Sequence, residues 1–138
     1  MKNLWLFILT FISTNLFAQS HLVQKNLEVG AIIHINKCKD VSFVSMDIYT
    51  KTRYPESGIK IDSITGDGVF ENFFDPGDFD VKRLPASYGD HNYKVAALRV
   101  FDDKDGSQRR VMICYTQNKR SMIWVEIDKA FELKEIEF

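Results

Sequence analysis

The sequence predicts a mainly β protein: a single antiparallel β-sandwich or barrel-like meander of about seven or eight strands, with room for one short helix. Three observations predict it. Segments that alternate apolar and polar residues recur along the chain, turn residues separate them, and the segments nearest the C-terminus are apolar on both faces. Strands covered on both faces belong in a barrel, a sandwich, or a sheet with a helix against it.

The first 18 residues have the order of an export signal. Lys2 precedes an apolar run at residues 4–11, and Ala18 supplies a small residue for cleavage. We expect cleavage after Ala18, so that residues 1–18 are a signal peptide and 19–138 form one β-rich exported domain. The run is shorter than the about 20 apolar residues that cross a bilayer. We therefore expect a periplasmic or secreted protein with no membrane span after cleavage.

The first half of this domain contains two strong strand signals and several weaker ones. Residues 27–36 alternate between apolar and polar side chains, and residues 41–53 are rich in β-branched and aromatic side chains. A turn separates them, so we expect the two segments to pair as a hairpin. The remaining expected elements are a breaker at 54–58, a short alternation at 58–64, a strand or single helical turn at 69–74, a turn at 75–78, a short strand at 79–84 and a loop at 85–92.

The C-terminal third predicts a hairpin followed by a third strand. Residues 93–101 and 109–116 flank a polar loop with an Asp-Gly pair, which is typical of hairpins. Residues 121–128 are expected to pair next, and residues 129–138 predict either an edge strand or a short helix. Alternation assigns the side chains of each strand to two opposite faces. In residues 93–101, Val95, Ala97 and Phe101 are expected opposite Leu98 and Val100; in residues 109–116, Val111, Ile113 and Tyr115 are expected opposite Met112 and Cys114. In residues 121–128, Ile123, Val125 and Ile127 are expected opposite Met122 and Trp124.

Two cysteines, Cys38 and Cys114, are present in the chain. Export would place them in an oxidising compartment, where two thiols pair readily. We therefore expect a disulfide between them, the alternative being two separately buried thiols that pack as small hydrophobic side chains.

The charge balance argues against a nucleic-acid partner. The whole chain has a formal net charge of −1, and loss of Lys2 with the signal makes it slightly more negative. Nucleic-acid binding requires a marked basic surplus. We therefore expect no nucleic-acid partner. Because the domain is expected to be exported, we expect its partner to be another envelope or secreted protein.

The most unusual segment is the acidic stretch, residues 62–80, which contains no lysine or arginine. Phenylalanines alternate with its acids, so it is a candidate docking surface for a basic partner. Its carboxylates are also a candidate Ca²⁺ site, although no loop here matches an EF-hand. The third alternative is a solvated connector whose phenylalanines fill the core. The candidate binding residues are Asp67, Glu71, Asp75, Asp78 and Asp80.

A second candidate surface is the polar loop before the C-terminal hairpin, with Tyr88 and Tyr93 as candidate binding residues. Loops held by a rigid sheet often carry recognition, and tyrosine is an anchor of low conformational entropy. The alternative is an ordinary connection between strands.

Motifs for catalysis or metal binding are weak throughout the chain. His21, His34 and His91 lack zinc-ligand spacing, and no Gly-x-Ser-x-Gly sequence is present. The leading hypothesis is a non-catalytic protein-binding domain of the inhibitor or immunity type, with no cofactor. The alternatives are a β-domain that binds a small ligand or Ca²⁺, and a small hydrolase.

Overall fold

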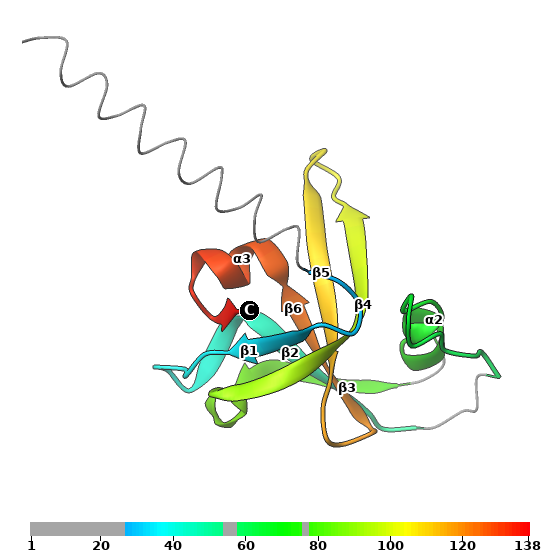
Figure 1. The fold of residues 1–138 in the computed structure, drawn as a ribbon, viewed down its shortest axis with the longest axis horizontal. Coiled ribbons are helices and arrows are strands. Elements are labelled where there is room, and N and C mark those ends of the chain that lie inside the picture. The colour runs from blue at the N-terminus through cyan, green and yellow to red at the C-terminus, as the bar shows by residue number, and fades with distance from the viewer. Residues whose placement is uncertain (1–26, 54–57, 76–77) are drawn as a thin grey trace, which may run out of the picture.

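The computed structural model describes residues 27–53, 58–75 and 78–138; the expected signal peptide lies outside them. Within these residues, seven antiparallel strands form one curled sheet in the order β3-β2-β6-β5-β4-β1-β7 (Figure 1). The predicted mainly β, barrel-like class is confirmed. The strands are β1 (Ile32–Ile35), β2 (Ser42–Lys51), β3 (Phe79–Pro85), β4 (His91–Asp102), β5 (Gln108–Tyr115), β6 (Ser121–Glu126) and β7 (Ile136–Glu137).

Three short helical segments accompany the sheet. The α-helices α2 (Val69–Phe73) and α3 (Ile127–Glu132) lie on opposite sides of it, and the 3-10 helix η1 (Ala86–Tyr88) follows β3 (Figure 1). The segment 69–74 is therefore a helical turn rather than a strand. Residues 129–138 contain both of the expected alternatives, because α3 is followed by the edge strand β7. No helix in the described part of the chain is long and apolar enough to cross a membrane.

The predicted C-terminal hairpin is confirmed. Strand β4 pairs with β5, and β6 pairs with β5 on its other side. The connecting loop closes through a hydrogen bond from the Asp103 N–H to the Ser107 carbonyl. Gly106 has a φ of 85°, a left-handed conformation that favours glycine at this position.

The predicted hairpin between residues 27–36 and 41–53 is wrong. Strand β1 pairs with β4 and β7, whereas β2 pairs with β3 and β6. Alternation of apolar residues indicates which face of a strand is buried, but it does not indicate the neighbouring strand. The long apolar partner of β2 is β6, where Met46 lies opposite Val125 and Ile48 opposite Ile123.

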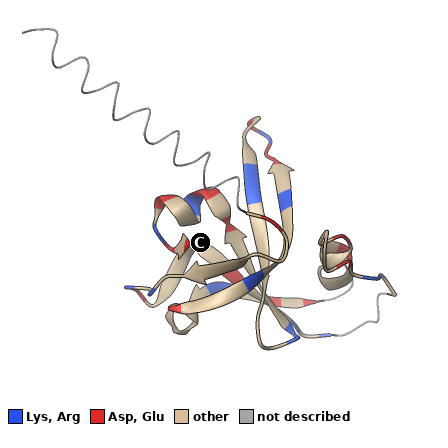
Figure 2. Cartoon of the chain, viewed as in Figure 1, with Lys and Arg blue, Asp and Glu red and all other residues tan. Residues whose placement is uncertain are grey.

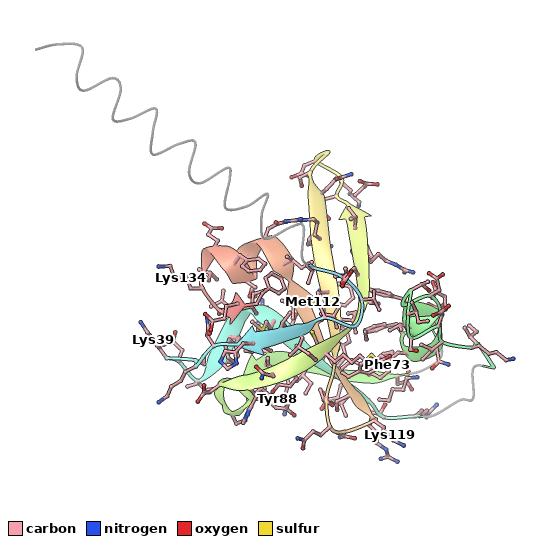
Figure 3. All side chains as sticks on the ribbon, in the orientation of Figure 1. Lys39, Phe73, Tyr88, Met112, Lys119 and Lys134 are labelled. Atoms are coloured by element: carbon pink, nitrogen blue, oxygen red, sulfur yellow. The ribbon has the colours of Figure 1, made fainter. Side chains whose placement is uncertain are left out.

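Two hydrophobic cores lie on the two faces of the sheet (Figure 3). The inner core fills the curl and includes Met112, Cys114 and Ile123 together with Ala130 of α3. The outer core lies beneath α2 and includes Phe73. The faces predicted for β5 and β6 are therefore confirmed, since each strand contributes alternate residues to the two cores.

The predicted faces of β4 are wrong at one point. Val95 belongs to the inner core and Ala97 to the outer core, although residues two positions apart in a regular strand share a face. The pairing register with β5 shifts between these residues, because an extra residue bulges out of the ladder. The bulge reverses the alternation, and it lies next to the point where β4 stops pairing with β5.

The predicted disulfide is not formed: Cys38 and Cys114 are free thiols. Strand β4 lies between β1 and β5, and Cys38 is beyond the end of β1. Cys114 is within β5, so a whole strand separates the two segments that carry the cysteines, and their sulfur atoms are not bonded. Burial raises the pKa of the Cys114 thiol above its usual value, so this side chain behaves as a small core hydrophobe.

Candidate binding groove

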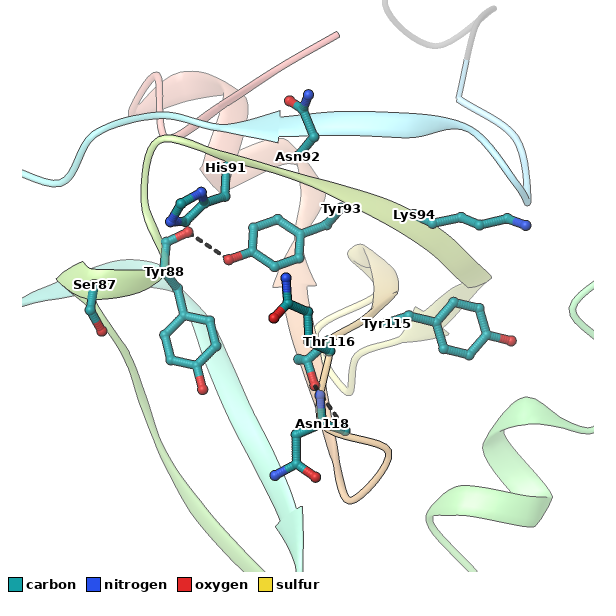
Figure 4. Close-up of a pocket in the computed structure, with 10 residues that line it drawn as sticks. Ser87, Tyr88, His91, Asn92, Tyr93, Lys94, Tyr115, Thr116 and Asn118 are labelled. Atoms are coloured by element: carbon teal, nitrogen blue, oxygen red, sulfur yellow. Dashed lines mark hydrogen bonds between the residues drawn. The ribbon is translucent and has the colours of Figure 1, made fainter.

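An open groove lies where β4 separates from β5 (Figure 4). The first half of β4 pairs with β1, and its second half pairs with β5 from Val95 onwards. Beyond Cys114, β5 has no further pairs with β4, so the two strands diverge. The resulting space has a volume of about 640 Å³. Its lining residues, which we call the tyrosine groove, are Ser87, Tyr88, His91, Asn92, Tyr93, Lys94, Tyr115, Thr116, Gln117 and Asn118.

One wall of the groove is the segment that joins β3 to β4. Its backbone is anchored to the chain around β1 and β2: the Ala86 N–H donates to the Val41 carbonyl at 2.9 Å, and the Asp90 N–H donates to the Ile35 carbonyl at 2.8 Å. A Cβ atom at Gly89 would lie 2.7 Å from the Asn36 carbonyl oxygen. Glycine is therefore required here for the wall to approach its support so closely.

Tyr88 of this wall is joined directly to Tyr93 of β4. The Tyr93 hydroxyl donates a hydrogen bond to the Tyr88 carbonyl oxygen at 2.8 Å (Figure 4). Both rings pack against the inner core while remaining partly exposed. Burial raises the pKa of Tyr93 above its usual value, and the neighbouring Tyr88 and Cys114 raise it further. Tyr93 therefore stays a neutral hydrogen-bonding group at physiological pH.

The opposite wall is the turn between β5 and β6. The Thr116 hydroxyl oxygen accepts a hydrogen bond from the Asn118 N–H and lies 2.9 Å from the Ser121 carbonyl oxygen. The Asn118 side chain accepts a bond from the Arg120 N–H at 3.0 Å. Each of these bonds fixes the turn, so both walls of the groove hold their shape before any ligand arrives.

The groove is lined by aromatic and polar side chains, with no acid among its lining residues. Lys94 is exposed on its rim, and Ser87 and Gln117 present exposed polar side chains. Elsewhere, lysines, arginines and acids mix on the β4–β5 hairpin and on α3 (Figure 2). The groove therefore differs from its surroundings in combining tyrosines with a single lysine.

The phenylalanines of the acidic stretch face the interior rather than solvent. Phe70 and Phe73 of α2 are buried in the outer core, and Phe74 and Phe79 pack against it. Their rings contact each other and Tyr49 at centroid distances of 4.9 to 6.1 Å. Because these rings stabilise the fold, a partner docked on the stretch would find few aromatic anchors.

Three carboxylates of the acidic stretch are engaged locally. Glu71 accepts a hydrogen bond from Arg99 at 2.8 Å, which lowers the pKa of Glu71 below its usual value. Asp78 lies 3.6 Å from Arg53. Asp62 accepts bonds from the backbone N–H groups two and three residues later, and these bonds lower its pKa.

The remaining acids of the stretch, Asp67, Asp75 and Asp80, are exposed on separate elements. In the described part of the chain, no three histidine, cysteine or acidic side chains are grouped closely enough to hold a metal ion. Of the residues predicted from sequence, the structure thus brings together Tyr88 and Tyr93 but does not gather the five acids.

Sequence reasoning did not identify half of the groove. Tyr115, Thr116, Gln117 and Asn118 belong to the second wall, and this region was expected only as the end of one strand and the connection to the next. They lie near Tyr93 where β4 stops pairing with β5, and the residue pattern gives no clear signal of where that pairing ends.

No protein-family model matches this chain, and comparisons with curated proteins and with solved structures gave no significant match. The chemistry of the groove is therefore the basis for assigning a function.

Proposed function

We propose that this chain is an exported, non-catalytic protein-binding domain, and that it binds its partner in the tyrosine groove. The observation that supports this most is the groove itself, in which three tyrosines and several hydrogen-bonding side chains surround an open space of about 640 Å³. Tyrosine rings provide large contact areas at a low cost in conformational entropy, and their hydroxyls satisfy polar groups of a partner.

The geometry favours a protein loop or extended segment as the occupant. Both walls are held by hydrogen bonds within the domain, so binding need not order them. Such preorganisation leaves more of the contact energy available as affinity. Lys94 on the rim, with no acid among the lining residues, favours a neutral or acidic segment of an envelope or secreted protein.

A small-molecule ligand is the second candidate, because the volume lies within the about 300–1,000 Å³ typical of ligand pockets. The same lining residues would serve it. A binding experiment with this domain as bait distinguishes the two candidates. A protein partner would be retained on the bait, whereas a small ligand would fill the groove and no protein would be retained.

The test compares two matched double variants as bait for envelope and secreted fractions of the source cell. Ser87→Trp with Lys94→Glu fills the groove and reverses its charge; Ser107→Trp with Lys104→Glu makes the same changes on the β4–β5 hairpin. All four side chains are exposed. We expect the groove variant to lose partner binding by about tenfold or more, because bulk and charge oppose docking there. The hairpin variant should bind like the wild type.

Equal binding by both variants, each with an unchanged melting temperature, would remove the groove from the proposal. Loss of binding only in the hairpin variant would place the partner on the opposite end of β4.

A further inference from the structure

Strand β3 is an edge of the sheet. It pairs with β2 on one side and, among the described residues, with no strand on the other. An edge of this kind presents a row of backbone N–H and C=O groups to any strand that approaches it. The identity of the outward groups can be worked out from the hydrogen bonds of β2.

Backbone groups of β2 alternate between its two neighbours. The Lys51 N–H donates to the Arg120 carbonyl at 2.9 Å, on the β6 side. The Thr52 N–H donates to the Asp78 carbonyl at 3.0 Å, on the β3 side. Because successive residues point to opposite sides, the even-numbered residues of the regularly paired part of β2, Ile48 and Thr50, bond to β3.

The pairing register between β2 and β3 shows which backbone groups of β3 bond to β2 and which do not. Asp80 and Lys82 lie opposite even-numbered residues of β2, so their backbone groups bond to β2. The backbone groups of Phe79, Val81 and Arg83 therefore point to the free edge. Val81 is 47% exposed, and Asp80 and Lys82 are exposed as well.

We propose that β3 is a self-association edge, at which two copies of this chain pair their β3 strands antiparallel about a two-fold axis through Val81. In such a pair Val81 exchanges both backbone hydrogen bonds with Val81 of the second copy. Asp80 then lies opposite Lys82 of the second copy, and the symmetry repeats this opposite-charge contact. Phe79 lies opposite Arg83, where a guanidinium can stack on the ring.

The charges select this register over its neighbours. A symmetric antiparallel pair must place one residue on the axis, because closely and widely spaced pairs alternate along the strands. An axis through Lys82 or Asp80 would place each of these charges opposite itself, which is unfavourable. An axis through Val81 instead makes two opposite-charge contacts and joins the two exposed valines.

The test measures self-association of the purified protein by sedimentation equilibrium over a range of concentrations. We expect a reversible monomer–dimer equilibrium for the wild type. Asp80→Lys and Lys82→Asp should each weaken the dimer about tenfold, since each places like charges opposite one another twice. An equal mixture of the two variants should recover a dimer, because opposite charges again face each other at both positions.

Val81→Pro provides a second, independent variant. It removes an outward N–H while leaving every hydrogen bond to β2 in place, so it should give a folded monomer. A wild type that remains monomeric at the highest concentration reached overturns the proposal. Charge variants that dimerise like the wild type, or growth beyond the dimer, overturn it equally.

Discussion

At the scale of single residues, Glu135 links the turn between α3 and β7 to a bulged part of β2 through hydrogen bonds. Its carboxylate accepts hydrogen bonds from the Val44 N–H at 2.8 Å and the Ser45 N–H at 3.0 Å, and also from the Ser45 hydroxyl. Ser45 is 1% exposed. The pairing of β2 with β3 is interrupted in this region, so the side chain of Glu135 satisfies donors that no strand reaches.

Glu135→Ala is therefore expected to lower the free energy of unfolding by about 2–4 kcal/mol, because it leaves the backbone N–H and the hydroxyl of buried Ser45 without an acceptor. Urea denaturation measures this loss. Glu137→Ala, an exposed position two residues away, is the matched control and should change stability by about 0.5 kcal/mol or less. Equal midpoints for the two variants would show that Glu135 does not hold β2.

The cysteines illustrate the limit of residue-level inference. Their presence in a chain expected to be exported predicted a disulfide, but neither the expected compartment nor the number of cysteines indicates where each cysteine lies in the sheet. Cys114 lies within β5 and is fully buried, whereas Cys38 is partly exposed in the loop after β1. Pairing depends on distance between strands, which two cysteines in a sequence cannot convey.

At the scale of elements, α2 depends on its packing. A helix of five residues is not stable alone in water. Phe73, which is 4% exposed, packs it onto the sheet, and the Lys51 ammonium lies 4.8 Å from the centre of that ring. The Lys51 ammonium also donates to the Asn72 carbonyl at 3.0 Å, which ties the helix to the end of β2.

Phe73→Ala is expected to cost about 3–5 kcal/mol in the free energy of unfolding, through lost burial and the remaining cavity. The control is Phe138→Ala, where the ring is 47% exposed and the expected loss is about 1 kcal/mol or less. Chemical denaturation with a circular-dichroism readout compares the two. Similar losses would mean that α2 contributes little to the fold.

Elements with strict alternation were predictable from sequence. Strands β4, β5 and β6 follow their expected ranges closely, and the two faces of β5 and β6 are as predicted. The pairing of β1 and β2 was not predictable, because periodicity encodes burial and not partners. The helical turn at α2 was also open, since five residues are too few for a helical period to show.

At the scale of the whole molecule, the phenylalanines and acids of residues 62–80 serve different parts of the structure. The rings complete the outer core, and several carboxylates bind nearby arginines or backbone. They were predicted to form one candidate surface because the sequence shows how residues are spaced along the chain but not which way each side chain points in the fold. Tyr88 and Tyr93 were found from loop chemistry, but the wall opposite them depends on how β4, β5 and β6 pair, which the sequence does not show.

The central claim is that the partner binds in the tyrosine groove. The most direct measurement places a photo-crosslinking amino acid at Gln117 in the groove, at Asp75 in the acidic stretch, or at Lys104 on the β4–β5 hairpin. All three side chains are exposed. Irradiation in the presence of envelope and secreted proteins is predicted to give a specific adduct from position 117 alone. An adduct from position 75 or 104, with none from 117, would contradict the claim.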